Sequence, residues 1–188
     1  MVVVTIVQCH RWWSTPCETR GVSVFPLARI QIPAPQFSEP TLYVRSSGTI
    51  DSFGLHLSKD GRATFDTAFG VFAAGRWSRL TSITDLVATM HISGRALVEL
   101  IAYAGGVDTV IASSDEGGTL SCDDIRAVSA ESFYVAVTAL EDGVIVRGGE
   151  WGTNTPPTRN VHLGVAITTF NRQDYVLATI DKLVALEA

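Results

Sequence analysis

The stretch Phe133-Tyr-Val-Ala-Val-Thr-Ala139 decides the fold, because its residues alternate between the two faces of a strand. Phe133, Val135 and Val137 fall on one face, and the even-numbered residues between them fall on the other. Antiparallel sheets commonly pack one face on a core, and an alternating strand is typical of them. The stretch therefore predicts a strand of an antiparallel sheet.

Similar short segments, rich in Val, Ile, Leu, Thr and aromatic residues, recur from about Val24 to Arg147. Turn residues at 59–61, 115–118 and 141–143 separate some of them. Nine or ten such strands imply two packed sheets, so we expect a mainly β fold, an antiparallel, jelly-roll-like β-sandwich. The stretch 74–80 is expected to be a helical turn or an irregular loop. The other expected strands are 27–32, 42–45, 53–57, 63–67, 83–91, 96–102, 107–112, 125–128 and 143–147.

The segments that flank the sandwich domain, expected at 23–150, follow other patterns. Residues 1–22 show neither alternation nor helical periodicity, so we expect an N-terminal extension that is poorly packed or disordered. Residues 151–160 predict a linker, because Pro156 and Pro157 donate no backbone hydrogen bond and disfavour helical geometry in the preceding residue.

A buried strand and an amphipathic helix are expected within residues 161–188. Residues 163–169 are almost continuously apolar, as in strands that are covered on both faces. Apolar residues recur at spacings of three and four from 172 to 188, which predicts a helix with one apolar stripe. A strand followed by such a helix begins a βαβ unit. We therefore expect a truncated α/β domain here, and a chain that is a fragment of a longer protein.

Composition and charge exclude several classes of protein. The 14 Lys and Arg against 19 Asp and Glu give a net charge of −5, so we expect no nucleic-acid partner. We expect no transmembrane segment, because no apolar run approaches the ~20 residues that a spanning helix needs. Three cysteines, Cys9, Cys17 and Cys122, favour unpaired thiols in a reducing cytoplasm. We expect no metal site, because His10 beside the first two cysteines has no fourth ligand nearby.

Five segments carry a family resemblance, in order along the chain. They are the residues 65–69 (FDTAF), Phe72, 76–81 (RWSRLT), 148–151 (GGEW) and 164–172 (GVAITTFNR). Together they resemble the N-terminal β-sandwich and first βα segment of the polymerising galactofuranosyltransferases of actinobacterial cell walls. These are family 2 glycosyltransferases of the GT-A fold. The resemblance runs from about residue 24 to residue 188.

The resemblance implies an N-terminal accessory domain of a UDP-galactofuranose-dependent glycosyltransferase that makes cell-wall or surface galactan. Such an enzyme transfers a galactofuranosyl unit to a glycan acceptor with inversion. It uses Mg²⁺ or Mn²⁺ on a D-x-D motif and a separate carboxylate base. The sequence shows neither element, so we expect no catalytic residue and no cofactor in this fragment. The parent enzyme is expected in the cytoplasm, peripheral at the inner face of the membrane.

Two departures from the family pattern leave the sugar and its linkage open. The family commonly has Asn where this chain has Gly70, and Pro where it has Thr168. The adjacent acids Asp123 and Asp124 are interpreted as a solvated loop, because they offer two neighbouring carboxylates and no phosphate-binding partner.

The resemblance assigns a partial nucleotide-sugar site to Thr169, Phe170, Asn171 and Arg172. These residues follow the expected strand at its carboxyl end, where α/β folds bind ligands. Arg172 would place its guanidinium against phosphate or uracil oxygens. The alternative is that Asn171 caps the helix and Arg172 is a solvated residue of its first turn.

Two tryptophans, Trp77 and Trp151, are candidates for stacking on sugar rings. The alternative is that they pack in the core or at an interface, as large aromatic side chains do in most folds. Two other functions stay open at this stage. The first alternative is a free-standing carbohydrate-binding module, and the second is a structural domain that forms homo-oligomers.

Overall fold

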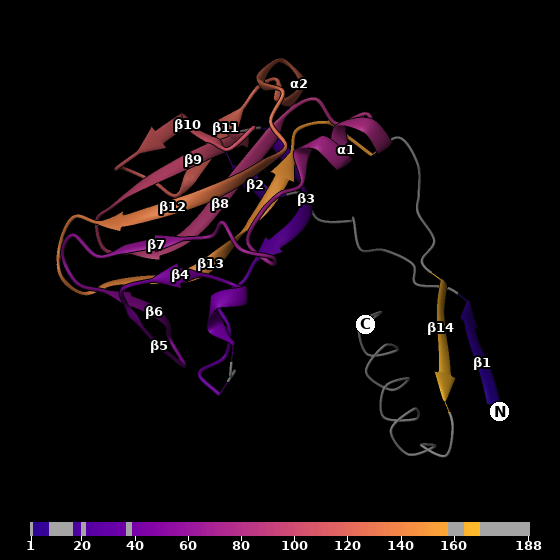
Figure 1. Cartoon of the computed structure of the whole chain (residues 1–188), viewed down its shortest axis with the longest axis horizontal. Coiled ribbons are helices and arrows are strands. Elements are labelled where there is room, and N and C mark those ends of the chain that lie inside the picture. The colour runs from indigo at the N-terminus through magenta and orange to yellow at the C-terminus, as the bar shows by residue number, and fades with distance from the viewer. Residues whose placement is uncertain (1, 8–16, 20–21, 37–38, 158–163, 170–188) are drawn as a thin grey trace. The chain divides into compact units, whose positions relative to one another are not determined.

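The computed structural model divides the chain into two compact units (Figure 1). The larger unit spans Pro16–Pro156, and the smaller one joins Met1–Thr15 to Pro157–Ala188. The residues described by the structure are 2–7, 17–19, 22–36, 39–157 and 164–169.

The first sheet of the larger unit has five antiparallel strands, with β12 at its centre. Phe133, Val135, Val137 and Ala139 on β12 belong to the main core, which confirms that these residues share the core face. The other face of β12 is also covered, because Tyr134 and Ala136 are buried in a second, smaller cluster. The strand order is β10 (Val107–Ser114), β9 (Ala96–Ala104), β12 (Ser132–Ala139), β7 (Arg62–Thr64) and β4 (Arg45–Ser46).

The second sheet has seven strands, and β13 is its hub because it pairs with β8, β3 and β6. All of its pairings are antiparallel. The order along its main path is β11 (Thr119–Cys122), β8 (Leu86–Ser93), β13 (Val144–Thr153), β3 (Val22–Ile30) and β2 (Cys17–Thr19). The hairpin of β5 (Thr49–Asp51) and β6 (Gly54–Leu57) joins at β13.

One hydrophobic core holds the two sheets together. Leu100 and Val135 of the five-stranded sheet belong to the same buried cluster as Leu86 and Val146 of the seven-stranded sheet. Burial of apolar area at an interface of this kind is the main stabilising contribution in folding. The mainly β, antiparallel fold is therefore confirmed, and its two sheets pack as a sandwich.

Short helices gather at one end of the sandwich (Figure 1). The stretch expected to be a helical turn or a loop forms α1 (Ala74–Leu80), which contacts α2 (Ile125–Val128). The expected strand 125–128 is therefore wrong. The Asp124 carboxylate accepts hydrogen bonds from the amides of Arg126 and Ala127, both at 2.9 Å, and this cap starts a helix.

Other boundaries differ from the sequence-based expectation. The expected strand at 42–45 is a 3₁₀ turn, η1 (Pro40–Leu42), followed by the short strand β4. Strands β5 and β11 were not expected. Strand β13 continues to Thr153, so the first three residues of the expected linker 151–160 belong to the sheet, where Thr153 pairs with Phe25.

The smaller unit contains one antiparallel pair of strands, β1 (Val2–Val7) and β14 (Gly164–Thr169). A strand is thus present where 163–169 predicted one, but its partner is antiparallel and comes from the other end of the chain. The stretch 1–22, expected to lack regular structure, contains β1 and β2. The sequence of β1, VVVTIV, is entirely β-branched, which favours a strand. The helix expected at 172–188 lies outside the described residues.

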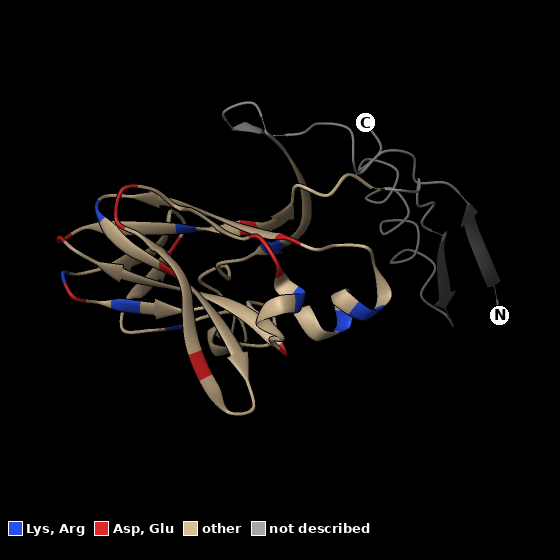
Figure 2. Ribbon diagram, turned by 90° about the horizontal axis from the view of Figure 1, so that it is seen from above, with Lys and Arg blue, Asp and Glu red and all other residues tan. Residues whose placement is uncertain are grey.

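In the view of Figure 2, positions of Lys and Arg and positions of Asp and Glu both occur along the ribbon of the sandwich. Among the described residues, no helix is both long and apolar enough for a membrane span.

Candidate functional site

A pocket opens at the end of the sandwich opposite the helices, between two connections that cross from one sheet to the other. The first connection, through Gly94 and Arg95, leads from β8 to β9. The second, 115–118, leads from β10 back to β11. Both lie at the same end because Ser114 pairs with Val98, near the start of β9.

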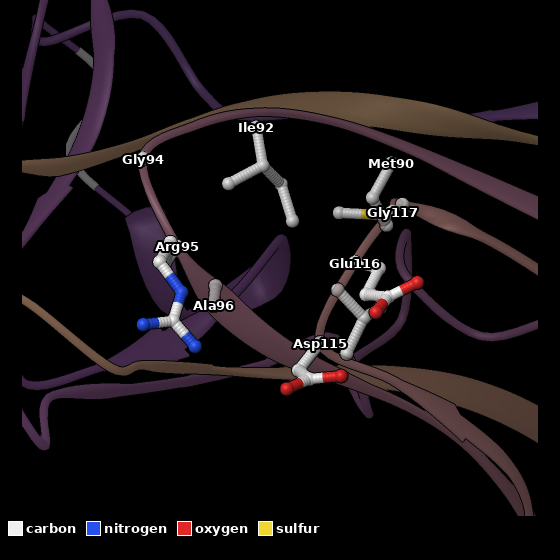
Figure 3. Close-up of a pocket in the computed structure, with 10 residues that line it drawn as sticks. Met90, Ile92, Gly94, Arg95, Ala96, Asp115, Glu116 and Gly117 are labelled. Atoms are coloured by element: carbon white, nitrogen blue, oxygen red, sulfur yellow. The ribbon is translucent and has the colours of Figure 1, made fainter.

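The pocket has a volume of about 510 Å³ and combines an apolar wall with a charged rim (Figure 3). Arg95 extends from the β8–β9 connection, while Asp115 and Glu116 extend from the β10–β11 connection. The lining residues are Met90, Ile92, Gly94, Arg95, Ala96, Val98, Asp115, Glu116, Gly117 and Gly118.

Hydrogen bonds to backbone groups fix both connections. The amide of Arg95 donates to Glu141 Oε1 at 2.8 Å, and its carbonyl accepts from Leu140 at 3.0 Å. The Gly118 carbonyl accepts from the Met90 amide at 2.7 Å. A Cβ at Gly118 would lie 2.0 Å from the Met90 carbonyl oxygen, so this close approach requires glycine. The pocket walls are therefore held without help from the side chains of Arg95, Asp115 and Glu116.

The charged side chains of the rim have no ionic partner in the described part of the chain. Arg95, Asp115 and Glu116 are all exposed, and none forms an ion pair with a described residue. Guanidinium groups donate hydrogen bonds and carboxylates accept them. The rim can therefore donate to and accept from a ligand that carries both kinds of polar group.

Charged groups on the outer face of the five-stranded sheet are, by contrast, already paired. The Arg62 guanidinium donates to Glu99 Oε2 at 2.8 Å and to Thr138 Oγ1 at 2.9 Å. Arg45 forms an ion pair with Asp66. These side chains hold neighbouring strands together, so they are less available to a ligand than those of the pocket rim.

The resemblance segments that belong to the sandwich meet at its helical end. The Phe72 ring stacks on Trp77, with ring centroids 5.4 Å apart, and lies 5.7 Å from the Trp151 ring. Trp151 Nε1 donates to the Gly70 carbonyl at 3.2 Å. The motifs from 65–81 and 148–151 therefore build one aromatic cluster of the core rather than a catalytic centre.

The two candidate stacking residues take different places in this cluster. Trp151 is 1% exposed, so its ring offers no face to a sugar. It packs in the core, which was the alternative to stacking on a sugar. Trp77 is half-buried on α1 and packs against the core. Stacking on a glycan stays a hypothesis for Trp77 alone.

The paired glycines of the 148–151 motif allow the strand to pass close to its neighbour. Gly148 has φ +94° at an irregularity in the pairing of β13 with β8. A Cβ at Gly149 would lie 2.1 Å from the Thr89 carbonyl oxygen. The motif thus serves the backbone geometry that places Trp151 in the core.

Asp85 ties down the chain where it leaves β13. Its carboxylate accepts hydrogen bonds from the hydroxyls of Thr153 and Thr155 at 2.8 and 2.7 Å, and from the Asn154 amide at 2.7 Å. Burial raises the pKa of Asp85, but the hydrogen bonds from Asn154, Thr155 and Thr153 outweigh it and hold the pKa below its usual value.

The predicted nucleotide-sugar site can be located only in part. Thr169 is the last residue of β14, while Phe170, Asn171 and Arg172 lie outside the described residues. In the described ranges, no group of three residues could hold a metal ion. Asp123 and Asp124 are exposed, and Asp124 caps α2.

Sequence reasoning missed the pocket residues Arg95, Asp115 and Glu116. It marked 115–118 only as a turn, from its two glycines. The turn pattern alone does not predict a pocket, because the pocket depends on the pairing of β8 with β11, which joins residues about thirty positions apart.

Two curated proteins with the same name are similar to this chain. No protein-family model matches the chain. Over 179 residues it is 26% identical to galactofuranosyltransferase GlfT2 of Mycolicibacterium smegmatis, covering 82% of this chain and 26% of the relative. The chain is a distant relative of galactofuranosyltransferases.

A second relative agrees with the first. Galactofuranosyltransferase GlfT2 of Mycobacterium tuberculosis is 25% identical over 168 residues, covering 78% of this chain and 26% of the relative. The chain therefore spans about a quarter of the length of the curated relatives it matches.

Proposed function

We propose that the chain is the N-terminal accessory part of a UDP-galactofuranose-dependent glycosyltransferase that builds cell-wall or surface galactan. The observation that carries the proposal is the match of about four-fifths of this chain to one quarter of two galactofuranosyltransferases. In this proposal the sandwich supports the enzyme and receives glycan, and the chemistry belongs to a catalytic domain beyond it.

The arrangement of the sandwich supports an accessory role. Its motif residues are occupied in packing, as the buried Trp151 illustrates, so they are not free for transfer chemistry. Its end opposite the helices offers a pocket with unpaired polar groups. Both features suit a domain that holds a glycan without cleaving or forming a glycosidic bond.

The smaller unit supplies the proposed start of the catalytic domain. We propose that β14 leads into a family 2 transferase domain of the GT-A type, in which Thr169, Phe170, Asn171 and Arg172 contact the UDP-sugar. The complete enzyme would require Mg²⁺ or Mn²⁺ to neutralise the leaving diphosphate. It would act in the cytoplasm at the inner face of the membrane.

An immunoprecipitation tests this proposal. Antibodies raised against the 188-residue chain are used on a lysate of its source cells, and the precipitate is assayed for galactofuranosyl transfer from UDP-galactofuranose to a galactofuranosyl disaccharide. We expect a polypeptide several times larger than 20.2 kDa, with metal-dependent transfer activity. The purified 188-residue chain should transfer no sugar.

A precipitate that contains only a 20.2 kDa polypeptide and no transfer activity would contradict the proposal. It would favour the second candidate, a free-standing carbohydrate-binding module. The free polar groups around the pocket are the observation that supports this candidate.

A further inference from the structure

We propose that the pocket bounded by Arg95, Asp115 and Glu116 binds a neutral glycan, the acceptor side of the proposed reaction, and not the nucleotide-sugar donor. The ligand class rests on the proposed function, while the site rests on the geometry of the pocket (Figure 3). None of the predicted site residues belongs to this pocket.

The charges of the rim favour a neutral ligand. One guanidinium and two carboxylates face the same space, so their formal charges sum to −1. A diphosphate would bring its negative charge against Asp115 and Glu116, and like charges at close range repel. A sugar hydroxyl, however, can donate to either carboxylate and accept from Arg95.

The wall of the pocket complements a sugar ring in a second way. Met90 and Ile92 come from β8, and Ala96 and Val98 come from β9. Met90, Ala96 and Val98 are at most 5% exposed, so the half-buried Ile92 is the apolar side chain of the pocket that is most accessible to a ligand. Sugar rings present C–H groups on their faces and hydroxyls at their edges. A ring that places a C–H face against Ile92 therefore directs hydroxyls towards the rim.

The size of the pocket suits one or two sugar residues. Ligand pockets for small molecules range over ~300–1,000 Å³, and this pocket has about 510 Å³. Its open side lets a longer chain continue into solvent. We infer that the end of a glycan, rather than an internal segment, occupies the pocket.

The outer face of the five-stranded sheet is the competing surface for a glycan. It exposes Tyr103, which is 37% exposed on β9. Its Arg62, however, is already bonded to Glu99 and Thr138. A sugar that bonds to Arg62 must compete with Glu99 and Thr138. A sugar in the pocket has no such competitor, because the rim side chains form no ion pair with a described residue.

A binding titration of the full 188-residue chain tests the proposal. The probe is the methyl glycoside of a galactofuranosyl disaccharide, followed by ligand-observed NMR, with UDP as the comparison ligand. We expect saturable disaccharide binding with a Kd of about 0.1–1 mM, a weak affinity set by few contacts. UDP should show no saturable binding in the same range.

Three variants locate the binding. Arg95→Ala, and the double variant Asp115→Ala with Glu116→Ala, should each raise the Kd at least about tenfold, as the loss of charged hydrogen-bonding groups does. Arg76→Ala and Asp123→Ala are matched controls, because both residues are exposed and lie outside the pocket lining. The control variants should bind like the wild-type chain, and melting curves verify that every variant is folded.

Absence of saturable disaccharide binding would overturn the proposal, and so would equal losses in pocket and control variants. Tighter binding of UDP at the pocket would also overturn it. If the immunoprecipitated enzyme transfers sugar while the chain binds no disaccharide, only this inference fails. If the chain binds the disaccharide but the precipitate has no transfer activity, only the proposed function fails.

Discussion

The two ends of the sandwich use polar and aromatic residues in opposite ways. At the helical end, Trp151 is buried with its indole hydrogen-bonded, and Asp85 accepts three hydrogen bonds. At the other end, Arg95, Asp115 and Glu116 surround a hollow and are not paired with one another. One end is built for stability, while the other leaves its polar groups available to a ligand.

The comparison separates the residues that make this chain resemble its relatives from those that could bind a ligand. The resemblance motifs of the sandwich, within 65–81 and 148–151, contribute to the aromatic cluster at the helical end, where they support packing. The pocket residues belong to none of those motifs. Substitutions at the two ends should therefore affect different properties, stability at the first and glycan binding at the second.

The largest effect is expected for Trp151→Ala. Removing this buried ring should lower the free energy of unfolding by about 3–5 kcal/mol, because it leaves a cavity beside Phe72 and an unpaired Gly70 carbonyl. Urea unfolding followed by circular dichroism measures the change. A loss below about 1 kcal/mol would show that the helical end does not depend on this cluster.

A smaller effect is expected for Asp85→Ala, at about 2 kcal/mol, because Thr153 loses a partner at a buried position. The wild-type pKa of Asp85 lies below its ordinary value of 3.8, so its contribution is present above that pH. It is lost as the pH falls through the lower folded-state pKa. Unfolding curves between neutral and acid pH should therefore converge for the two proteins.

The control for Asp85 is Asp123→Ala, which removes an exposed carboxylate with no recorded hydrogen bond from the described residues. It should leave both the stability at neutral pH and the acid dependence close to wild type. A constant difference between wild type and Asp85→Ala at all pH values would contradict the assignment of the stabilisation to the ionised carboxylate.

Trp77→Ala should cost about 1 kcal/mol, since this ring is half-buried and stacks on Phe72 from one side. If Trp77 packs only within the protein, the variant will bind the galactofuranosyl disaccharide as well as wild type does. Loss of binding in a folded variant would instead support the stacking hypothesis and move the glycan site to the helical end.

The smallest effect on stability is expected at the pocket. Arg95→Ala, and the double variant of Asp115 and Glu116, should change the free energy of unfolding by less than about 0.5 kcal/mol, as exposed side chains without partners usually do. A loss above about 1 kcal/mol would show that the rim supports the fold, and would remove the contrast between the two ends.

The sequence predicted the sandwich well where local patterns suffice. Alternation marked β12, and turn residues marked the connections at 59–61, 115–118 and 141–143, since side-chain period and backbone preference are local properties. The prediction of a strand at 125–128 was wrong because the composition of this run fits a strand, while the cap from Asp124 starts a helix.

Features that depend on the pairing of distant strands could not be predicted from the sequence. The partner of β14 is β1, more than 150 residues away in the sequence, and no local pattern indicates such a pairing. The same limit hid the pocket, because Arg95 and Asp115 come together only when β8 pairs with β11 and β9 pairs with β10. Trp151 was assigned two roles because sequence alone does not give burial.

Mapping the disaccharide onto the chain by ¹⁵N–¹H correlation spectra tests the central claim most directly. We expect saturable amide shifts at 94–96 and 115–118, with the Trp77 and Trp151 indole signals unchanged. Shifts that gather instead at the indoles, or on the outer face around Arg62 and Glu99, would contradict the claim that the free charged groups mark the glycan site.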